Sequence, residues 1–273
     1  FKIPVAHIHG GETTRGAFDE QFRHSITKMS HIHFAATKEY RRKIIQMGED
    51  PSKVFCFGAP GLDNIKRLHL FDRKTLWNEL RLPEDKRIGV VTFHPVTLEF
   101  DTAERQMTQL LAALKSFKEI FWVFTSANAD PQGRKIEKKI ESFVKGNSLQ
   151  AKLFISLGQL KYLSLLKYSD VMVGNSSSGI IEAPSFRLPT VNIGDRQDGR
   201  IRTVNVIDVK EYKKELIFKA IKKAISMEFR KSLRQLKNPY GTGEASEKIL
   251  AILKNITLNS NLIKKEFYEF GGS

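Results

Sequence analysis

The sequence predicts an α/β protein built from two Rossmann-like units, and three observations support this. Short apolar runs alternate with helical patterns in residues 2–57, in the order strand, helix, strand, helix, strand. A second and longer series of the same kind begins at residue 88. Within it, residues 171–182 place a glycine, an asparagine and three serines between an apolar run and a helical pattern. Such alternation is typical of parallel sheets covered by helices.

The first unit begins with an apolar run that predicts a buried strand at residues 2–8. Apolar side chains at helical spacing and an acidic first turn predict a helix from residue 18 to residue 29. A strand at 32–36, a helix at 38–47 and a strand at 53–57 follow. Glycine and proline at residues 58–61 break the pattern, and we expect connecting helices to about residue 81.

The second unit repeats the alternation more completely. We expect strands at 88–93, 120–124, 152–155, 170–173, 189–193 and 204–209, with helices at 101–117, 133–144, 158–168, 178–186, 211–227 and 244–255. The expected domains are the remainder of an amino-terminal Rossmann-like domain at 1–70, a nucleotide-binding domain at 71–245, and a carboxyl-terminal helix and tail at 246–273. A substrate would lie between the first two, at the carboxyl ends of the strands.

Composition limits the class of protein. The 273 residues are enough for one large or two medium domains, and 41% hydrophobic with 27% charged residues is typical of a globular protein. No apolar run reaches the roughly 18 residues of a membrane span, and no signal peptide is visible. The single cysteine, Cys56, excludes an internal disulfide. We therefore expect a cytoplasmic protein, although the chain does not begin with methionine.

The net charge of +15 raises the question of a nucleic-acid partner. The basic residues are scattered over the polar faces of helical patterns, and no aromatic-interleaved RNA-binding signature accompanies them. We therefore interpret the charge as solvated helix surface and expect no nucleic-acid partner and no membrane partner. The charge would still attract an anionic substrate.

The segment at residues 171–182 is the strongest chemical signal. A strand, a tight turn at Gly174 and a helix start would point free backbone N–H groups at one place, where a phosphate binds well. Glu182 lies about one turn into that helix and could accept hydrogen bonds from a sugar diol. An ordinary strand-to-helix turn with serine caps is the alternative.

Two further segments lie in the first unit. His7 and His9 would share one face of the first strand and lead into two glycines and Glu12. Zinc is conceivable there, but we expect no metal because a carboxylate partner at fixed spacing is not evident. In the helix that follows, Asp19 with Arg23 and Glu20 with His24 are spaced four residues apart. A surface ladder of ion pairs is the simpler interpretation of that spacing.

Two more segments follow strands of the second unit. His94 ends the first strand of that unit, and a proline then fixes the exit of the chain. A single histidine there is more often structural than functional. Arg196 follows a later strand and could reach the same anion as the serines from a neighbouring loop.

Together these segments resemble the UDP-N-acetylglucosamine 2-epimerases, most closely the hydrolysing branch that begins the synthesis of sialic and legionaminic acids. The resemblance covers residues 5–65 and 88–206. It rests on five segments of this chain: His-Ile-His-Gly-Gly-Glu at 7–12, Asp-Glu before Arg-His-Ser-Ile-Thr-Lys at 19–28, His-Pro-Val-Thr at 94–97, Gly-Asn-Ser-Ser-Ser-Gly at 174–179 with Glu182, and Asn-Ile-Gly-Asp-Arg at 192–196. It implies the GT-B fold, in which two Rossmann-like domains enclose a cleft.

The resemblance also implies roles for particular residues. The substrate would be a UDP-sugar, no cofactor would be needed, and the protein would form a homodimer. His94 would contact the pyrophosphate and counts among the catalytic candidates, and Asn128 would lie beside the nucleotide sugar. Ser176 and Ser177 would bind phosphate, Glu182 the ribose hydroxyls and Arg196 the diphosphate or nucleotide. Asp19 matches one carboxylate of the family.

This chain departs from the family pattern in two ways. Related sequences have glutamate where this chain has His9, so the proton transfer would fall to His9 or Glu12, or the sugar would differ. The family's first domain also begins about a hundred residues earlier, so we expect this domain to be incomplete here and an upstream aspartate to be missing. Such a fragment would be inactive by itself.

The sequence leaves several functions open. The leading prediction is a hydrolysing UDP-N-acetylglucosamine 2-epimerase, which eliminates UDP to a glycal and adds water to give N-acetylmannosamine. The same reaction on UDP-N,N'-diacetylbacillosamine and the non-hydrolysing epimerase are close alternatives. A GT-B glycosyltransferase is a weaker one. A nucleotide-sugar binding module without catalysis and a basic nucleic-acid-binding protein come from other classes.

Overall fold

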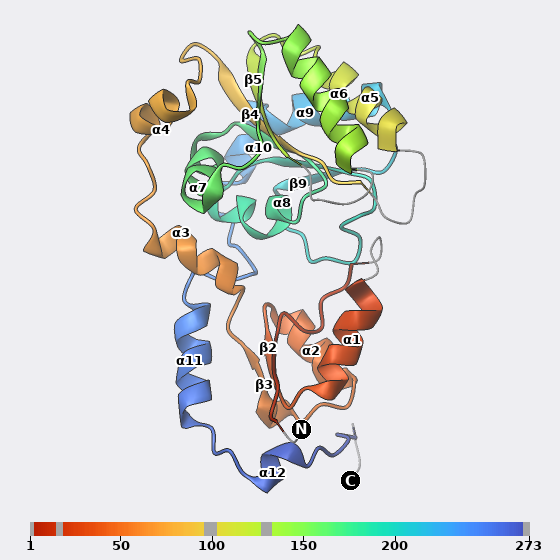
Figure 1. Ribbon diagram of the computed structural model, residues 1–273, viewed down its shortest axis with the longest axis vertical. Coiled ribbons are helices and arrows are strands. Elements are labelled where there is room, and N and C mark those ends of the chain that lie inside the picture. Colours follow the sequence, from red (N-terminus) through yellow and green to blue (C-terminus); the bar gives the residue numbers. More distant parts are fainter. Residues whose placement is uncertain (1–2, 15–18, 96–102, 127–132, 270–273) are drawn as a thin grey trace. The chain divides into compact units, whose positions relative to one another are not determined.

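Figure 1 shows the computed structural model of the chain, which describes residues 3–14, 19–95, 103–126 and 133–269. The chain forms two compact units: Phe1–Arg67 together with Asn238–Ser273, and Leu68–Lys237. The first boundary lies close to the expected one at residue 70. The carboxyl-terminal residues differ from expectation, because they belong with the first unit and not with the nucleotide-binding domain or a separate tail.

The first unit is a small parallel sheet with helices on both faces. Its strands are β1 (Ala6–Ile8), β2 (Ile32–Ala35) and β3 (Val54–Cys56), in the spatial order β1-β2-β3. Helices α1 (Asp19–Met29) and α2 (Lys38–Gln46) lie on one side of it, and α11 (Ala245–Asn255) lies on the other (Figure 1). The unit also contains α3 (Asp63–Arg67), α12 (Ser260–Ile263) and short 3-10 turns at Pro51–Lys53 and Pro60–Leu62.

The carboxyl-terminal segment is held to this unit by packing and by a cap. Ala245, Ile249 and Leu262 pack in one buried cluster with Ile32 and Phe34 of β2. The buried carboxylate of Asp63 accepts hydrogen bonds from the backbone N–H groups of Ala245 (2.9 Å) and Ser246 (2.7 Å) and thereby caps the amino terminus of α11. A cap supplied from so far away in the sequence cannot be recognised from local pattern.

The first strand differs from its prediction as a buried strand. Only residues 6–8 are extended and paired, and Ile3, Val5 and Ile8 are 66%, 42% and 43% exposed. Among the described strands β1 pairs with β2 alone, so one of its edges has no strand beside it. The apolar run predicted burial because strands covered on both faces have this composition.

The second unit is a six-stranded, fully parallel sheet. Its strands are β4 (Arg87–Thr92), β5 (Ile120–Thr125), β6 (Ala151–Phe154), β7 (Val171–Gly174), β8 (Thr190–Ile193) and β9 (Val206–Val209). Their spatial order is β6-β5-β4-β7-β8-β9. The chain runs outward from β4 in one direction and returns to run outward from β7 in the other. This places a topological switch point between β4 and β7, where open α/β sheets bind their ligands.

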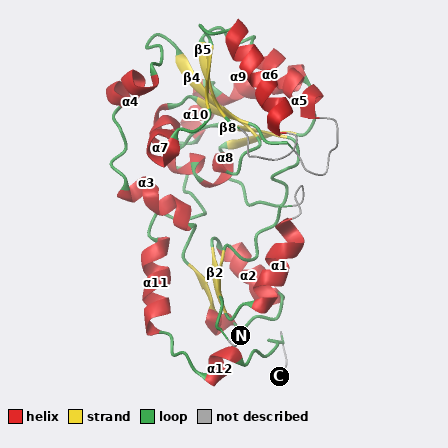
Figure 2. Ribbon diagram, viewed as in Figure 1, coloured by secondary structure: helices red, strands yellow, loops and turns green. Residues whose placement is uncertain are grey.

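Helices cover both faces of this sheet (Figure 2). The helices of this unit are α4 (Arg73–Leu80), α5 (Ala103–Leu114), α6 (Gly133–Gly146), α7 (Gly158–Tyr168), α8 (Ser178–Ile181), α9 (Lys214–Ala224) and α10 (Met227–Ser232). Helices α5, α6 and α9 share one core with the sheet, centred on Trp122 and Phe124. Helices α7 and α8 lie on the opposite face, where α7 contacts β4 and α8 contacts β8.

Most elements of the second unit agree with the sequence prediction, and one difference is informative. The helix expected at 178–186 is split into α8 and a 3-10 turn at Ala183–Phe186. Pro184 lacks the N–H that a continuous helix would need there, so the α-helix ends after one turn. Helices α10 and α12 were not predicted. Within the described residues, no helix is long and apolar enough to cross a membrane.

Candidate functional site at the switch point of the second unit

The chain reversal at Gly174 shapes the end of β7. Gly174 has a φ of +140°, and a Cβ atom on it would lie 1.9 Å from the carbonyl oxygen of Thr92. Only glycine fits both the conformation and the space. The next residue, Asn175, donates its backbone N–H to the same Thr92 oxygen at 3.2 Å. The loop after β7 is thereby pressed against the end of β4.

Asn175 ties three loops together. Its side-chain oxygen accepts the backbone N–H of His94 at 2.7 Å, and its side-chain nitrogen donates to the His94 carbonyl at 2.8 Å. Its own carbonyl accepts hydrogen bonds from Arg196 Nη1 (3.2 Å) and Gln197 Nε2 (2.8 Å). Asn175 is fully buried. The ends of β4, β7 and β8 therefore meet through one amide, and His94 and Arg196 are brought to the same place.

The His94 side chain is held as a neutral ring. Burial and, to a smaller extent, the nearby Arg196 guanidinium together lower the pKa of His94 to about 4. A neutral imidazole at physiological pH can donate a hydrogen bond without adding charge. The contact of His94 with a pyrophosphate stays a prediction.

Acid should destabilise the fold through buried histidines. Burial lowers the pKa of both His94 and His33 to about 4, well below the value near 6.5 of an exposed imidazole. The unfolded chain therefore binds more protons between about pH 6.5 and 4, so the free energy of unfolding should fall as pH falls through that range. Each histidine contributes up to roughly 3 kcal/mol to the loss.

Urea unfolding at pH 7, 5.5 and 4.5 measures the free energy of unfolding. In a His94→Gln variant this free energy should depend less steeply on pH. Equal stability at the three pH values would contradict the burial of these rings.

A hollow of about 380 Å³ opens beside the serines. It is lined by Thr92, Thr125, Ile155, Ser156, Leu157, Gly158, Gln159, Tyr162, Ser176, Ser177, Ser178 and Glu182. The Tyr162 hydroxyl donates to Ser178 Oγ at 2.8 Å, and burial raises the pKa of Tyr162 to about 12. Tyr162 is therefore a protonated donor at any physiological pH. Hydroxyls and one carboxylate suit a ligand that carries both phosphate and diol groups.

The helix that follows the serines is shorter than predicted. We expected a helix start whose dipole and free N–H groups bind phosphate, but α8 has a single turn and so a small dipole. One N–H is also already used, because Ser178 N donates to Ser176 Oγ at 3.3 Å. The hydroxyl of Ser177 and the charge of Arg196 are the groups near this turn that could bind an anion by direct contact.

A second group of polar residues lies in the first unit, at the end of β1. His9 has a φ of +65°, which is rare for a residue with a side chain, and its N–H donates to Phe34 O at 3.0 Å. Gly11 has a φ of +73°, and a Cβ there would lie 2.4 Å from the Tyr40 carbonyl oxygen. The turn brings the carboxylate of Glu12 back to the ring of His9, with 2.6 Å between Oε1 and Nδ1. Strained backbone of this kind is concentrated at functional sites.

The expectation that His7 and His9 share one face is wrong. The strand ends at Ile8, so the alternation of side chains does not extend to His9. His7 lies 3.1 Å from the Thr27 hydroxyl through Nδ1, and burial lowers the pKa of His7. In the part of the chain that the structure describes, no group of three histidine, cysteine or acidic residues could hold a metal ion.

Helix α1 confirms one of the two expected pairs. His24 Nε2 lies 3.1 Å from Glu20 Oε1, as the spacing predicted. Arg23 donates at 3.3 Å both to the Glu12 carbonyl and to Thr14 Oγ1, so it braces the turn after β1. Asp19 is the first residue of α1.

Some predicted residues lie outside the described part of the chain, and some important ones were missed. Asn128 and Thr97 fall outside the described residues. Asn175 was part of the quoted motif, but nothing in the sequence showed that its side chain would join three loops. Tyr162 carried no signal, since a tyrosine in an amphipathic helix is usually core.

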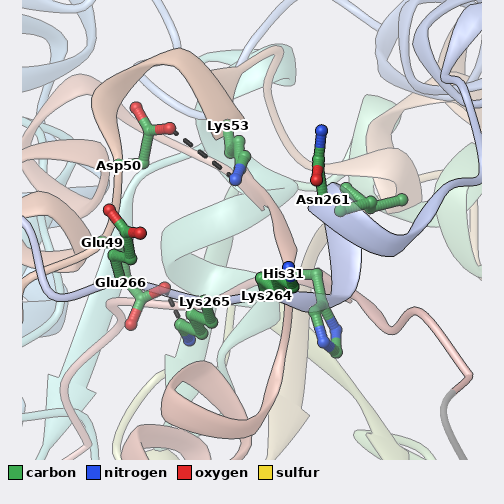
Figure 3. A pocket seen from close by; sticks show the side chains of 9 residues that line it. His31, Glu49, Asp50, Lys53, Asn261, Lys264, Lys265 and Glu266 are labelled. Atoms are coloured by element: carbon green, nitrogen blue, oxygen red, sulfur yellow. Dashed lines mark ion pairs between the residues drawn. The ribbon is translucent and has the colours of Figure 1, made fainter.

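A further cavity, of about 270 Å³, lies in the first unit (Figure 3). It is lined by His31, Glu49, Asp50, Lys53, Asn261, Leu262, Lys264, Lys265 and Glu266. Its charges pair with one another: Lys265 lies 2.6 Å from the buried Glu49, and Lys53 lies 3.8 Å from Asp50. Lys265 also donates to the carbonyls of Lys28 and Ser30. The cluster fastens the carboxyl-terminal segment to α1, and we assign no ligand to it.

Comparison with known proteins identifies the family. Residues 1–254 match the family model described as UDP-N-acetylglucosamine 2-epimerase. The chain is 41% identical over 263 residues to the GDP/UDP-N,N'-diacetylbacillosamine 2-epimerase (hydrolyzing) of Campylobacter jejuni, covering 96% of this chain and 68% of that protein. It is 40% identical over 269 residues to a polysialic acid biosynthesis protein of Escherichia coli, covering 98% and 68%.

A solved structure extends the likeness to the fold. The UDP-GlcNAc 2-epimerase of Neisseria meningitidis bound to UDP-GlcNAc matches with a TM-score of 0.78 at 22% identity, covering 93% of this chain and 71% of that one. The fold is therefore α/β of the GT-B type, as predicted. The chain belongs to the UDP-N-acetylglucosamine 2-epimerase family. It spans about two thirds of the length of the curated relatives it matches.

Proposed function

We propose that the protein is a hydrolysing 2-epimerase of a UDP-N-acetylated hexosamine, which releases UDP and the free manno-configured sugar. The observation that carries the proposal is the site at the switch point of the second unit, where Asn175 joins His94 and Arg196 beside the serine-lined hollow. The name of the Campylobacter jejuni relative, which is a hydrolysing 2-epimerase, supports the same class of reaction.

The second unit would bind the nucleotide. The hydroxyls of Ser176 and Ser177 and the guanidinium of Arg196 would bind the diphosphate, and His94 would donate to it as a neutral ring. Glu182 lines the same hollow as the serines and would accept hydrogen bonds from the ribose hydroxyls. Asn128 stays a proposed contact of the nucleotide sugar.

The first unit would carry the proton transfers. A base removes the proton from C2 of the sugar while the bond between C1 and the UDP oxygen breaks, which leaves a double bond between C1 and C2. Water then adds to C1, and an acid returns a proton to C2 from the opposite face. His9, Glu12 and Asp19 are the candidates for these steps, and His94 lies with the departing diphosphate. Such chemistry needs no redox cofactor.

The identity of the sugar has two candidates, and each has its own support. UDP-N,N'-diacetylbacillosamine is favoured by the name of the relative that shares 41% identity. UDP-N-acetylglucosamine, the substrate favoured by the sequence motifs, is supported by the description of the matching family model and by the polysialic acid relative. We propose the bacillosamine derivative first and UDP-N-acetylglucosamine second.

The test is to incubate the full-length protein with each nucleotide sugar in deuterated water and to identify the products by NMR. We expect UDP and a free sugar of manno configuration with deuterium at C2. A UDP-linked epimer would point to the non-hydrolysing reaction. UDP binding without any turnover would favour a binding module.

We also propose that the protein is a homodimer in the cytoplasm. Light scattering can check the oligomeric state, and cell fractionation can check the location.

Removing a single donor or acceptor from the nucleotide site should weaken UDP binding. We expect Ser177→Ala and Glu182→Ala each to cost about 1–3 kcal/mol, because each removes a directed hydrogen bond to a charged or desolvated group. Calorimetric titration with UDP gives the affinity. Ser232→Ala and Glu79→Ala, which change exposed residues of the same unit, serve as controls and should bind like the wild type. Unchanged affinity in both site variants would remove the assignment of this hollow to UDP.

A further inference from the structure

The turn after β1 holds an imidazole against a buried carboxylate. Nδ1 of His9 lies 2.6 Å from Oε1 of Glu12. The Glu12 side chain is 3% exposed, whereas that of His9 is 36% exposed. The left-handed conformation of His9 and its hydrogen bond to Phe34 O fix the backbone on one side of the pair, and the hydrogen bond from Arg23 to the Glu12 carbonyl fixes it on the other. The pair is therefore preorganised by its own backbone.

The short contact determines which ring nitrogen carries the hydrogen. An ionised carboxylate only accepts hydrogen bonds, so the hydrogen between the two groups belongs to Nδ1 of His9. A neutral imidazole has one N–H, which leaves Nε2 as an acceptor. Because the buried Glu12 occupies Nδ1, Nε2 is the ring nitrogen left for a ligand, on a side chain that is 36% exposed.

Two cationic side chains reach the turn that carries Glu12. Arg23 approaches from α1, where it donates to the Glu12 carbonyl at 3.3 Å. Lys43 approaches from α2 and donates to Thr13 Oγ1, in the residue that follows Glu12, at 2.6 Å. His7 lies on β1, two residues before His9, and its pKa is lowered by burial.

We propose that His9 and Glu12 act as one hydrogen-bonded pair, in which His9 takes the C2 proton through Nε2 and Glu12 is a positioning residue. This inference rests on the proposed 2-epimerase function. Nε2 accepts the C2 proton, the electrons of the C2–H bond form the double bond to C1, and the C1–O bond breaks with its electrons leaving on UDP. Glu12 keeps the hydrogen on Nδ1 and stabilises the positive charge of the ring by its proximity. The proton transfer thus belongs to His9.

The tautomer can be measured without any turnover. The protein is labelled with ¹⁵N-histidine, and long-range ¹H–¹⁵N spectra are recorded at pH 8, where an ordinary imidazole is neutral. A His9→Asn variant identifies the His9 signals among the seven histidines. We expect a protonated Nδ1 and an unprotonated Nε2 at His9. The opposite tautomer as the main form in the wild type would overturn the pair.

Kinetics of Glu12 variants test the positioning role. Glu12→Gln should lower kcat by at least about 10²-fold, the scale of losing one general base. KM should change less than threefold, because the nucleotide would rest on the second unit. Glu12→Asp, which keeps the carboxylate, should retain more turnover than Glu12→Gln. Glu79→Gln makes the same chemical change on an exposed ion pair with Lys161 and should leave kcat unchanged.

The outcomes separate the pair from the proposed function. Near wild-type kcat in Glu12→Gln, with an active wild type, would overturn the role of Glu12 and leave the 2-epimerase standing. A full-length wild type that turns over neither nucleotide sugar would overturn the proposed function and the catalytic role of the pair with it. In that case the tautomer of His9 would still decide whether the pair exists.

Discussion

Replacing Gly174 by alanine should abolish UDP binding and lower the free energy of unfolding of the second unit by at least about 3 kcal/mol. The φ of +140° is strained for any residue with a side chain, and strain of this kind costs on the order of 1–3 kcal/mol. The added Cβ would also lie 1.9 Å from Thr92 O, an atom of the backbone that cannot rotate away. The loop would have to shift, and the Asn175 side chain would lose its two hydrogen bonds to the backbone of His94.

Urea unfolding and UDP titration measure the two effects of this substitution. Gly146→Ala is the matched control, because a Cβ at Gly146, the last residue of α6, meets no atom within 4 Å. That variant should be as stable as the wild type or slightly more so. If Gly174→Ala lies within about 1 kcal/mol of the wild type and binds UDP normally, the reversal at Gly174 is not what builds the site.

In the protein active as a 2-epimerase, His9→Ala and Asp19→Asn should each lower turnover by at least about 10²-fold, the usual scale for one general acid or base. His9→Ala would remove the proposed base. Asp19 is the first residue of α1, and the amino terminus of a helix favours an ionised carboxylate. UDP affinity should remain nearly unchanged, because the nucleotide site belongs to the second unit. Steady-state kinetics and calorimetry together give both quantities.

The exposed His69 provides the control for these variants, since His69→Ala removes an imidazole without touching either site. Its turnover should equal that of the wild type. Wild-type turnover in His9→Ala together with complete loss in Glu12→Gln would assign the proton transfer to Glu12, against our proposal. A large loss of UDP affinity in His9→Ala would show that the ring binds the nucleotide.

The sequence by itself determined most of the elements and the fold class. Apolar runs such as residues 120–124 predicted strands, and helical spacing predicted helices such as residues 158–168, which the structure confirms as Gly158–Tyr168. These signals are local, because burial of one face imposes a period of two or 3.6 on the side chains. The motifs at residues 7–12 and 174–182 also led directly to the family.

Only the tertiary structure showed which contacts the residues of these motifs make. Asn175 joins His94 to Arg196 because the strand order places β4 beside β7 and β7 beside β8, an order that no local pattern contains. The contact between His9 and Glu12 depends on the left-handed conformation of His9. The neighbouring glycines permit this turn, but their presence does not predict it. The carboxyl-terminal segment joins the first unit through the distant cap at Asp63. In each case the deciding interaction either links residues that are far apart in the sequence or depends on one unusual backbone angle. The hydrophobic periodicity of the sequence reveals neither of these.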